Sequence, residues 1–227
     1  MNAEQQSTEP AVGIIGAGRA GTAFARALLR AGIDVDLCST RPPKALQHHL
    51  KIYAPGANPV PPEEIAASTA ERGPGIIILA VPQEELDDVA PDWAGAGILV
   101  DATNTWTYGD EPEPLPGWLQ GAVDEQLPSS MAIASRFPHT RVVKALNHIS
   151  HHDIASAANP ELPAQQRRAL AVAADDDQAR GMVMGLLHRM GFDPVSVGPL
   201  PAGKIMEPGG PLFDRPLRRE DILSVLR

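Results

Sequence analysis

The sequence predicts an α/β fold: a doubly wound parallel sheet of the Rossmann type with a small C-terminal α/β domain. A glycine cluster, GIIGAGRAG at 13–21, stands between an apolar run and a helix-compatible stretch. Later apolar runs of strand length lie at 75–82, 97–102 and 141–146. Continuous apolar runs are typical of parallel strands that are covered on both faces. Their alternation with helical segments predicts right-handed crossovers.

The glycine cluster predicts what the first turn binds. A strand over 11–15 leads into Gly16, Gly18 and Gly21, and a helix over 22–30 follows. This is the G-x-G-x-x-G fingerprint in its strand–turn–helix context. The first glycine permits a tight turn, the second lets the backbone approach a pyrophosphate, and the third lets the helix pack on the strand. We therefore expect a dinucleotide at the helix N-terminus; the alternative is a glycine-rich turn that binds nothing. The predicted turn also contains Ala17, Arg19 and Ala20.

The tip of the second strand, 33–38, favours NADP over NAD. NAD-binding forms of this fold carry an acidic residue about 20 positions after the glycines, where it binds the ribose hydroxyls. The corresponding position here is Arg41, whose guanidinium can pair with the 2′-phosphate of NADP. Asp36 comes too early and should lie within the strand. The other residues expected near this phosphate are Ser39, Thr40 and Lys44.

Small and polar residues follow the later strands. The run at 75–82 ends in Ala80, Val81 and Pro82, and a helix is expected from about Gln83. Ligands of open α/β sheets bind at the carboxyl ends of the strands, so these residues should face a ligand. The same reasoning applies to the residues after the next two strands. These are Thr103 and Asn104 after 97–102, and Asn147, His148 and Ile149 after 141–146.

The segment between the last two of these strands is predicted to be a long loop. Residues 108–130 are rich in proline, glycine and acidic residues, and long loops are uncommon unless they are functional or mobile. Within this segment, Ser129 or Ser130 can cap a short helix that runs through Ser135. The role of the loop over 105–130 cannot be read from the sequence.

The C-terminal part repeats the strand–helix alternation. We expect a strand over 168–174, a helix over 178–190, a strand over 193–197 and a last helix over about 218–226. The acidic run at 175–177 can cap the first of these helices, and Gly191 ends it. The expected division is a disordered lead-in over 1–10, a nucleotide-binding domain over 11–150 and a small domain over 151–227.

Composition favours a cytoplasmic enzyme. The formal net charge of −9 argues against binding to nucleic acid or to anionic membrane surfaces. No apolar run approaches the roughly 18 residues of a membrane-spanning helix, and the polar first ten residues do not resemble a signal peptide. The single cysteine, Cys38, suits a reducing compartment and should pack as a small core residue.

The chain resembles the coenzyme F420-dependent NADP reductases. The shared features are GIIGAGRAG, the Ser-Thr-Arg tip at 39–41, RVVKALNHI at 141–149 and AADDDQARGMVMGLLHRMGFDPVSVGPL at 173–200. The first is common among Rossmann proteins, whereas the last two are more specific. The resemblance implies a Rossmann domain and a short C-terminal domain, with the deazaflavin F420 in the cleft between them. It also implies a homodimer.

The resemblance further implies direct hydride transfer between C5 of the deazaflavin and C4 of the nicotinamide, without a catalytic protein acid or base. The glycine turn would hold the pyrophosphate of NADP, and residues 39–41 its 2′-phosphate. Asn147 would meet the deazaflavin or the nicotinamide amide, and the loop at 200–207 would flank the ring. The remaining residues implied to contact the cofactors are Ala80, Val81, Pro82, Thr103, Asn104, Ala145 and Ile149.

Two other functions stay open. The scaffold could serve an NADP-dependent reductase of another acceptor, such as a flavin, an imine or a metal ion, or an NADP sensor without turnover. His148, His151 and His152 would share one helical face, which makes a metal site conceivable. Because a single segment supplies all three, we expect no metal and assign them exposed or capping positions beside the cleft. Trp106 is expected to anchor a loop, with stacking on a cofactor as its alternative.

Overall fold

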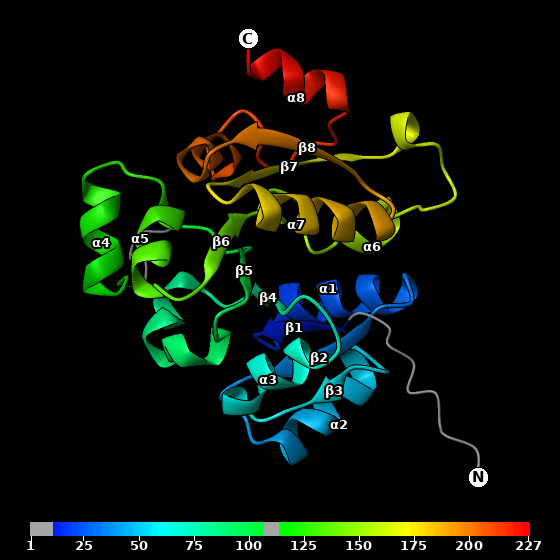
Figure 1. Ribbon diagram of the computed structural model, residues 1–227, viewed down its shortest axis with the longest axis vertical. Helices are drawn as coiled ribbons and strands as arrows, with labels where there is room; N and C mark the ends of the chain where they lie inside the picture. The colour runs from blue at the N-terminus through cyan, green and yellow to red at the C-terminus, as the bar shows by residue number, and fades with distance from the viewer. Residues whose placement is uncertain (1–10, 107–113) are drawn as a thin grey trace.

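The computed structural model describes residues 11–106 and 114–227, and its centre is one eight-stranded sheet (Figure 1). The strand order is β3-β2-β1-β4-β5-β6-β7-β8. From β3 to β6 every neighbouring pair is parallel. The bounds are β1 Ala11–Ile15, β2 Asp34–Cys38, β3 Asn58–Pro59, β4 Ile76–Leu79, β5 Ile98–Asp101 and β6 Arg141–Lys144. The predicted Rossmann-type α/β fold is confirmed.

The C-terminal strands extend the same sheet. β7 (Ala169–Ala174) pairs antiparallel with β6, and β8 (Asp193–Gly198) pairs parallel with β7. The antiparallel pairing is short, with Val143 opposite Ala174 and Lys144 opposite Ala173. The sheet is therefore continuous across the predicted boundary at 150, although its direction reverses there. The division into two domains stays a prediction.

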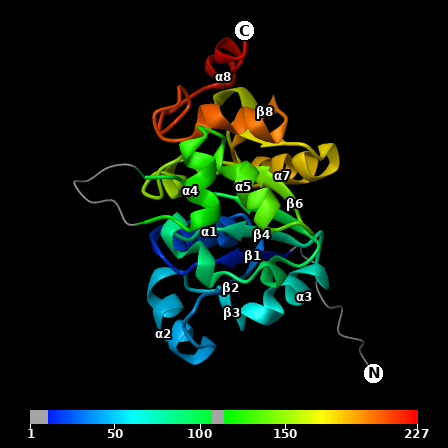
Figure 2. The same ribbon diagram turned by 90° about the vertical axis from the view of Figure 1, so that its left-hand side faces the viewer.

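Helices cover both faces of the sheet, as a doubly wound fold requires. The side chains of β4 alternate: Ile76 and Ile78 belong to one core, and Ile77 and Leu79 to the other. The first core is covered by α1 (Arg19–Arg30), α2 (Pro43–Tyr53), α6 (Ile154–Ala157) and α7 (Asp177–Arg189). The second is covered by α3 (Ile65–Ala70), α4 (Gly117–Asp124) and α5 (Ser129–Arg136). Figure 2 shows α4 and α5 together beside the sheet.

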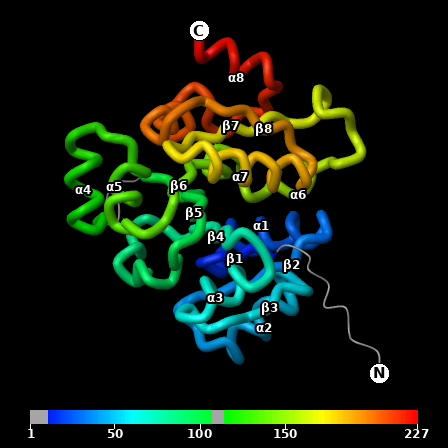
Figure 3. The backbone as a smooth tube through the Cα atoms, in the orientation of Figure 1, coloured from blue at the N-terminus to red at the C-terminus, as the bar shows by residue number. Residues whose placement is uncertain are grey.

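A third apolar cluster lies on the other face of β7 and β8. It includes Val195, Met206 and Ile222, and Ile222 comes from α8 (Arg219–Val225). The tube in Figure 3 follows the chain from β8 through the 3₁₀ segment η5 (Leu200–Met206) to α8 at the end of the molecule. Among the C-terminal predictions, the cap of α7 is confirmed, because Asp176 accepts a hydrogen bond from the Ala179 N–H.

The prediction of one long loop over 105–130 is wrong, because α4 lies within it and α5 begins at its end. Both helices begin directly after a proline, Pro116 and Pro128, which fits a helix start as well as a loop. Leu119 then buries α4 in the second core. No serine side chain caps α5. The helix expected from Gln83 is a 3₁₀ segment (Gln83–Asp88). Residues 107–113 and the predicted lead-in over 1–10 lie outside the described residues.

Candidate cofactor-binding cleft

The glycine turn has the geometry that its sequence predicts. Gly16 has φ +117°, and a Cβ on it would lie 2.3 Å from the Ala80 carbonyl oxygen. A Cβ on Gly21 would lie 1.9 Å from the Gly16 carbonyl oxygen, so α1 can approach β1 only without a side chain there. A Cβ on Gly18 would meet nothing within 4 Å. The space beside Gly18 is therefore open at the N-terminus of α1, where a pyrophosphate would bind.

His49 holds this turn from outside and was not predicted. Its Nε2 lies 2.9 Å from the Ala17 carbonyl oxygen, which can only accept a hydrogen bond, so the imidazole is the donor. His49 belongs to α2, 32 residues away in the chain. Nothing in the local sequence indicates this contact, because it depends on how α2 packs beside α1.

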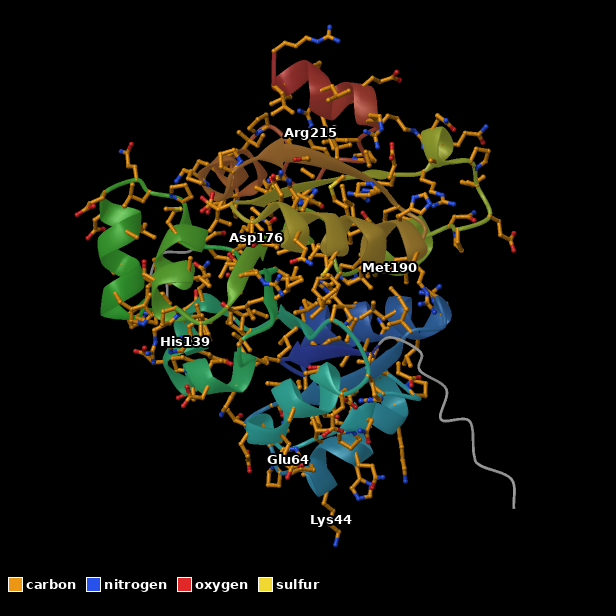
Figure 4. The ribbon with its side chains drawn as sticks, viewed as in Figure 1. Lys44, Glu64, His139, Asp176, Met190 and Arg215 are labelled. Atoms are coloured by element: carbon orange, nitrogen blue, oxygen red, sulfur yellow. The ribbon has the colours of Figure 1, made fainter. Side chains whose placement is uncertain are left out.

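The tip of β2 presents the predicted phosphate ligands to solvent. The Arg41 N–H donates to Ser39 Oγ at 3.1 Å, which shapes the loop between β2 and α2. Thr40, Arg41 and Lys44 are exposed. Figure 4 shows Lys44 pointing outward at the edge of the molecule. This arrangement leaves the Arg41 guanidinium accessible to a ligand.

Asp36, the alternative ribose ligand, is engaged elsewhere. Its carboxylate is fully buried within β2 and accepts hydrogen bonds from Asn58 Nδ2 at 2.8 Å and Ser68 Oγ at 2.6 Å. It also pairs with Arg72. Three partners inside the fold satisfy this carboxylate, which agrees with the expectation that it lies within the strand. No other acidic residue stands at the tip of the strand over 39–41.

A cavity of about 670 Å³ extends from the glycine turn across the carboxyl ends of β4, β5 and β6. This volume lies within the roughly 300–1,000 Å³ that is typical of small-molecule sites. The predicted residues that line it are Gly18, Arg19, Ala20, Ala80, Val81, Pro82, Thr103, Asn104, Asn147 and Ile149. Among the described residues, the predicted ones outside its lining are Gly16, Ala17, Gly21, Ser39, Thr40, Arg41, Lys44 and Ala145.

Aromatic side chains form part of the cavity wall and were mostly missed. Trp106 and Phe213 line it, with ring centroids 5.7 Å apart at 74°. Phe24 of α1 also lines it. Residues 200–207, which were expected beside a ring, do not belong to the described lining; Phe213 and Asp214 from the following loop do. A single phenylalanine in a proline-rich tail gives no signal of this placement.

A buried polar network lies directly beneath Thr103. Lys144 and Asp101 are both fully buried, and Lys144 Nζ lies 3.0 Å from Asp101 Oδ2. Lys144 also donates to the Thr103 carbonyl at 2.7 Å, and Ser130 Oγ donates to Asp101 at 2.6 Å. Gln83 donates to Thr103 Oγ1 at 2.9 Å. Because every one of these groups is paired, the network fixes the backbone at the end of β5.

Asn147 joins three parts of the cleft. Its Nδ2 donates to Asn104 Oδ1 at 3.0 Å and to the Met206 carbonyl at 2.7 Å. Its backbone carbonyl accepts from Asn104 Nδ2 at 2.8 Å. Both amide hydrogens are thus used within the protein, and the side chain orients Asn104. A direct contact between Asn147 and a cofactor stays a prediction.

His148 is a buried link to β7. The Ala171 N–H donates to His148 Nε2 at 3.0 Å, so the neutral ring carries its proton on Nδ1, 3.3 Å from Asn147 Oδ1. Burial lowers the pKa of His148 to about 3, and Arg168 and Lys144 add to this effect. The expectation of an exposed or capping histidine at this position is wrong, because the ring is only 2% exposed.

The prediction that His148, His151 and His152 share a helical face is also wrong. Leu146 leaves β6 with φ +66°, residues 147–153 form turns and bends, and α6 begins only at Ile154. Within residues 11–106 and 114–227, no three His, Cys, Asp or Glu side chains could hold a metal ion. Over the same residues, no helix is long and apolar enough to cross a membrane.

The glycine turn, the open sheet edge and the cavity between them are the features of a dinucleotide-binding site of the Rossmann class. Residues 11–105 match the model of a family described as "NADP oxidoreductase coenzyme F420-dependent". By this match, the nucleotide-binding part of the chain is similar to the F420-dependent NADP oxidoreductases. The family match supports an NAD(P)-dependent oxidoreductase. No curated protein matches the chain.

Solved structures share the fold at low sequence identity. A hypothetical protein from Sinorhizobium meliloti is 23% identical, with a TM-score of 0.74, over 95% of this chain and 98% of that one. A protein from Arthrobacter sp. FB24, proposed to be an F420-dependent NADP reductase, is 22% identical, with a TM-score of 0.65, over 92% and 99%. An imine reductase from Pseudomonas sp. is 19% identical, with a TM-score of 0.55, and this chain covers 57% of its length. At these identities the likeness concerns the fold.

Proposed function

We propose that the protein transfers a hydride directly between NADP(H) and the deazaflavin coenzyme F420. The observation that carries the proposal is the continuous cavity from the glycine turn to the aromatic pair Trp106 and Phe213. Such a cavity can hold a nicotinamide and a second planar ring in succession. The family match over 11–105 supports the same pair of coenzymes.

The residues of the cofactor half fit NADP. The open space beside Gly18 admits a pyrophosphate, and the backbone N–H groups at the start of α1 face it. Ser39, Thr40 and Arg41 stand at the tip of β2, where the 2′-phosphate would lie. Lys44 is the weakest member of the proposed set, because its side chain points outward (Figure 4).

The residues of the acceptor half would orient two rings and exclude water. When bound, the coenzymes would supply the chemistry: a hydride would pass between nicotinamide C4 and deazaflavin C5, and solvent would supply or take up the accompanying proton. Asn104 and Thr103 are held rigidly at the cleft by the networks through Asn147 and Lys144. Catalysis by such a site rests on proximity and orientation. The proposal therefore assigns no residue as a general acid or base.

The proposal extends to assembly and location. We infer a homodimer that works in the cytoplasm, with its F420 cleft between an NADP-binding domain over 11–150 and a small domain over 151–227. The family resemblance supports the dimer. The buried thiol of Cys38, whose pKa burial raises to about 12 with a smaller effect of Glu63, is unreactive and consistent with a reducing compartment.

The decisive experiment follows the visible absorbance of F420. The purified protein is mixed with NADPH and oxidised F420, with NADH as the matched control. Rapid bleaching with NADPH and little with NADH is expected. If NADPH binds but F420 is not bleached, F420 is not the acceptor. Flavins, imines and ferric chelates would then be screened with the same NADPH assay, and turnover with none of them would indicate a sensor.

A further inference from the structure

The side chain of Asn104 is an amide whose orientation the fold determines. Asn104 follows β5 and lines the cavity. Its Nδ2 donates to the Asn147 backbone carbonyl at 2.8 Å, and its Oδ1 accepts from Asn147 Nδ2 at 3.0 Å. The Met206 carbonyl, which accepts from the same Asn147 Nδ2 at 2.7 Å, fixes the Asn147 amide in turn. Because a carbonyl can only accept, the nitrogen and the oxygen of the Asn104 amide cannot be exchanged.

One hydrogen-bond donor and one acceptor of this amide remain for a ligand. An asparagine side chain has two N–H donors and two lone pairs on its oxygen, and Asn147 uses one of each. Over residues 11–106 and 114–227, the Asn104 side chain makes no further hydrogen bond. The residue is only partly exposed, so groups left unpaired there cost free energy. A ligand in the cavity can bind to this N–H and this oxygen together.

The two polar side chains beside Asn104 have less to offer a ligand. The Thr103 hydroxyl donates its hydrogen to Asp101 at 2.7 Å and accepts from Gln83 at 2.9 Å. Both N–H groups of Asn147 are engaged as well. Neither Thr103 nor Asn147 therefore has a donor left for the cavity. Asn104 differs from both of them, because it keeps a donor as well as an acceptor.

The position of Asn104 fits the nicotinamide end of a bound NADP. In the sheet, β4 lies between β5 and β1, the strand that leads into the glycine turn (Figure 1). Asn104 therefore stands two strand spacings, about 10 Å, from the turn. A ribose and a pyridine ring bridge a span of this order between the pyrophosphate and the carboxamide. The carboxamide has one carbonyl and one NH2 group, which complement the free N–H and the free lone pair of Asn104.

We propose that Asn104 binds the nicotinamide carboxamide and makes the protein selective for it, and that Asn147 positions Asn104 for this contact. The inference rests on the proposed function, because that function places NADP in this cavity. The free Asn104 N–H would donate to the carboxamide oxygen, and Asn104 Oδ1 would accept from the carboxamide NH2. This pair of hydrogen bonds would also fix the rotation of the pyridine ring, so that one face of the ring is turned towards the hydride acceptor.

The test compares NADP⁺ with its 3-acetylpyridine analogue, in which a methyl group replaces the amide NH2. The analogue keeps the carbonyl, so it loses only the hydrogen bond to Asn104 Oδ1. The Kd of each nucleotide is measured by calorimetry, without F420. The wild-type protein should bind NADP⁺ about 10-fold more tightly, because the analogue leaves a partly buried acceptor unpaired. Equal Kd values in the wild-type protein would overturn the inference without any variant.

Two variants assign the discrimination to Asn104. Asn104→Ala should weaken NADP⁺ binding about 30-fold and bring the two Kd values to within about twofold of each other. Asn104→Asp keeps the accepting oxygen and loses the donor, so both nucleotides should bind more weakly while about fivefold discrimination or more remains. Asn159→Ala is the matched control, because Asn159 is a partly exposed amide outside the cavity lining, and its Oδ1 accepts from the Glu161 N–H. Its two Kd values should stay within about twofold of the wild-type values.

The positioning role of Asn147 has its own readout. Asn147→Ala removes the group that donates to Asn104 Oδ1 and should therefore lower the ratio of the two Kd values. A general disturbance of the cleft would raise both Kd values equally and leave their ratio unchanged. An unchanged ratio in Asn147→Ala would thus overturn the positioning role.

The remaining outcomes separate this inference from the proposed function. An unchanged ratio in Asn104→Ala would assign the carboxamide to another group, and loss of discrimination in Asn104→Asp would mean that Oδ1 is not its acceptor. Because the Kd values need no hydride acceptor, a result in favour of Asn104 holds even if F420 is not reduced. Conversely, equal wild-type Kd values would overturn the role of Asn104 and leave hydride transfer to F420 unaffected.

Discussion

The two ends of the cleft differ in the groups that form them: backbone atoms at the glycine turn, and side chains from distant segments at the turn after β6. The glycine turn would bind its proposed ligand through backbone atoms, and its key positions, Gly16, Gly18 and Gly21, lie within six consecutive residues. The wall after β6 is built from side chains that reach across the fold. Asn147 bonds to Asn104 and to the Met206 carbonyl, 43 and 59 residues away in sequence. His148 accepts from the N–H of Ala171 in β7.

This difference determines where a mutation can change ligand binding without changing the stability of the fold. At the glycine turn, Gly18 has open space beside it, whereas Gly21 has no space for a single added carbon. In the turn after β6, both polar side-chain atoms of Asn147 are engaged, so any substitution there changes folding and positioning together. Mutations at the turn should therefore divide into structural and binding classes, whereas mutations at the wall should combine both.

The largest effect is expected from Gly21→Ala. Its Cβ would lie 1.9 Å from the Gly16 carbonyl oxygen, so α1 must move away from the turn. We expect a loss of roughly 3 kcal/mol or more in the free energy of unfolding, together with loss of NADPH binding. Urea denaturation of the ligand-free protein measures the first quantity. A stable variant with normal unfolding would mean that α1 and β1 are less closely packed than in this structure.

The next effect, Gly18→Ala, should change binding alone. The added Cβ meets no protein atom within 4 Å, and φ is −77°, a value that alanine adopts freely. Stability without ligand should change by less than about 0.5 kcal/mol. The methyl group would occupy the space proposed for the pyrophosphate, so the Kd for NADPH should rise about tenfold or more. Fluorescence titration with NADPH measures it, and an unchanged Kd would remove the pyrophosphate from this position.

Arg41→Gln tests the NADP preference at the same end. Loss of a charge-assisted contact to the 2′-phosphate should weaken NADPH binding about tenfold, while NADH binding stays unchanged. Lys51→Ala is the matched control, because Lys51 is an exposed lysine in the last turn of α2 and belongs to no proposed binding set; we expect a change of less than about twofold. Parallel titrations with both nucleotides decide the matter. Equal weakening for NADPH and NADH would show that Arg41 does not bind the 2′-phosphate.

The same contrast explains which features the sequence could predict. The strands, the close packing at Gly16 and Gly21, the cap at Asp176 and the burial of Asp36 within β2 depend on local pattern, and the sequence predicts all of them. The positions of His49, Phe213 and the Lys144–Asp101 pair depend on packing between distant segments, which one sequence does not reveal. The three histidines do not share a helical face, because the chain turns at Leu146, which has a positive φ. A leucine in the sequence does not predict that conformation.

The smallest of these effects at neutral pH concerns His148→Gln, at the wall. Glutamine also offers an oxygen to the Ala171 N–H, but the packing of the buried ring and its Nδ1 contact with Asn147 are lost, so the variant should be about 1 kcal/mol less stable at pH 7. The folded pKa of His148, about 3, lies below its ordinary value of 6.5, so the unfolded chain binds the proton more readily. The stabilising contribution is thus complete above about pH 6.5 and is lost as the pH falls towards 3, by up to about 1.4 kcal/mol per unit.

The glutamine variant lacks this titration, so the two stabilities should cross near about pH 6, below which the variant becomes the more stable protein. Urea denaturation of both proteins at pH 7, 6 and 5 measures the difference, and carboxylates common to both cancel. A difference that stays constant with pH would mean that His148 remains solvated. The turn after β6 would then resemble the glycine turn, where separate mutations are expected to change ligand binding and the stability of the fold.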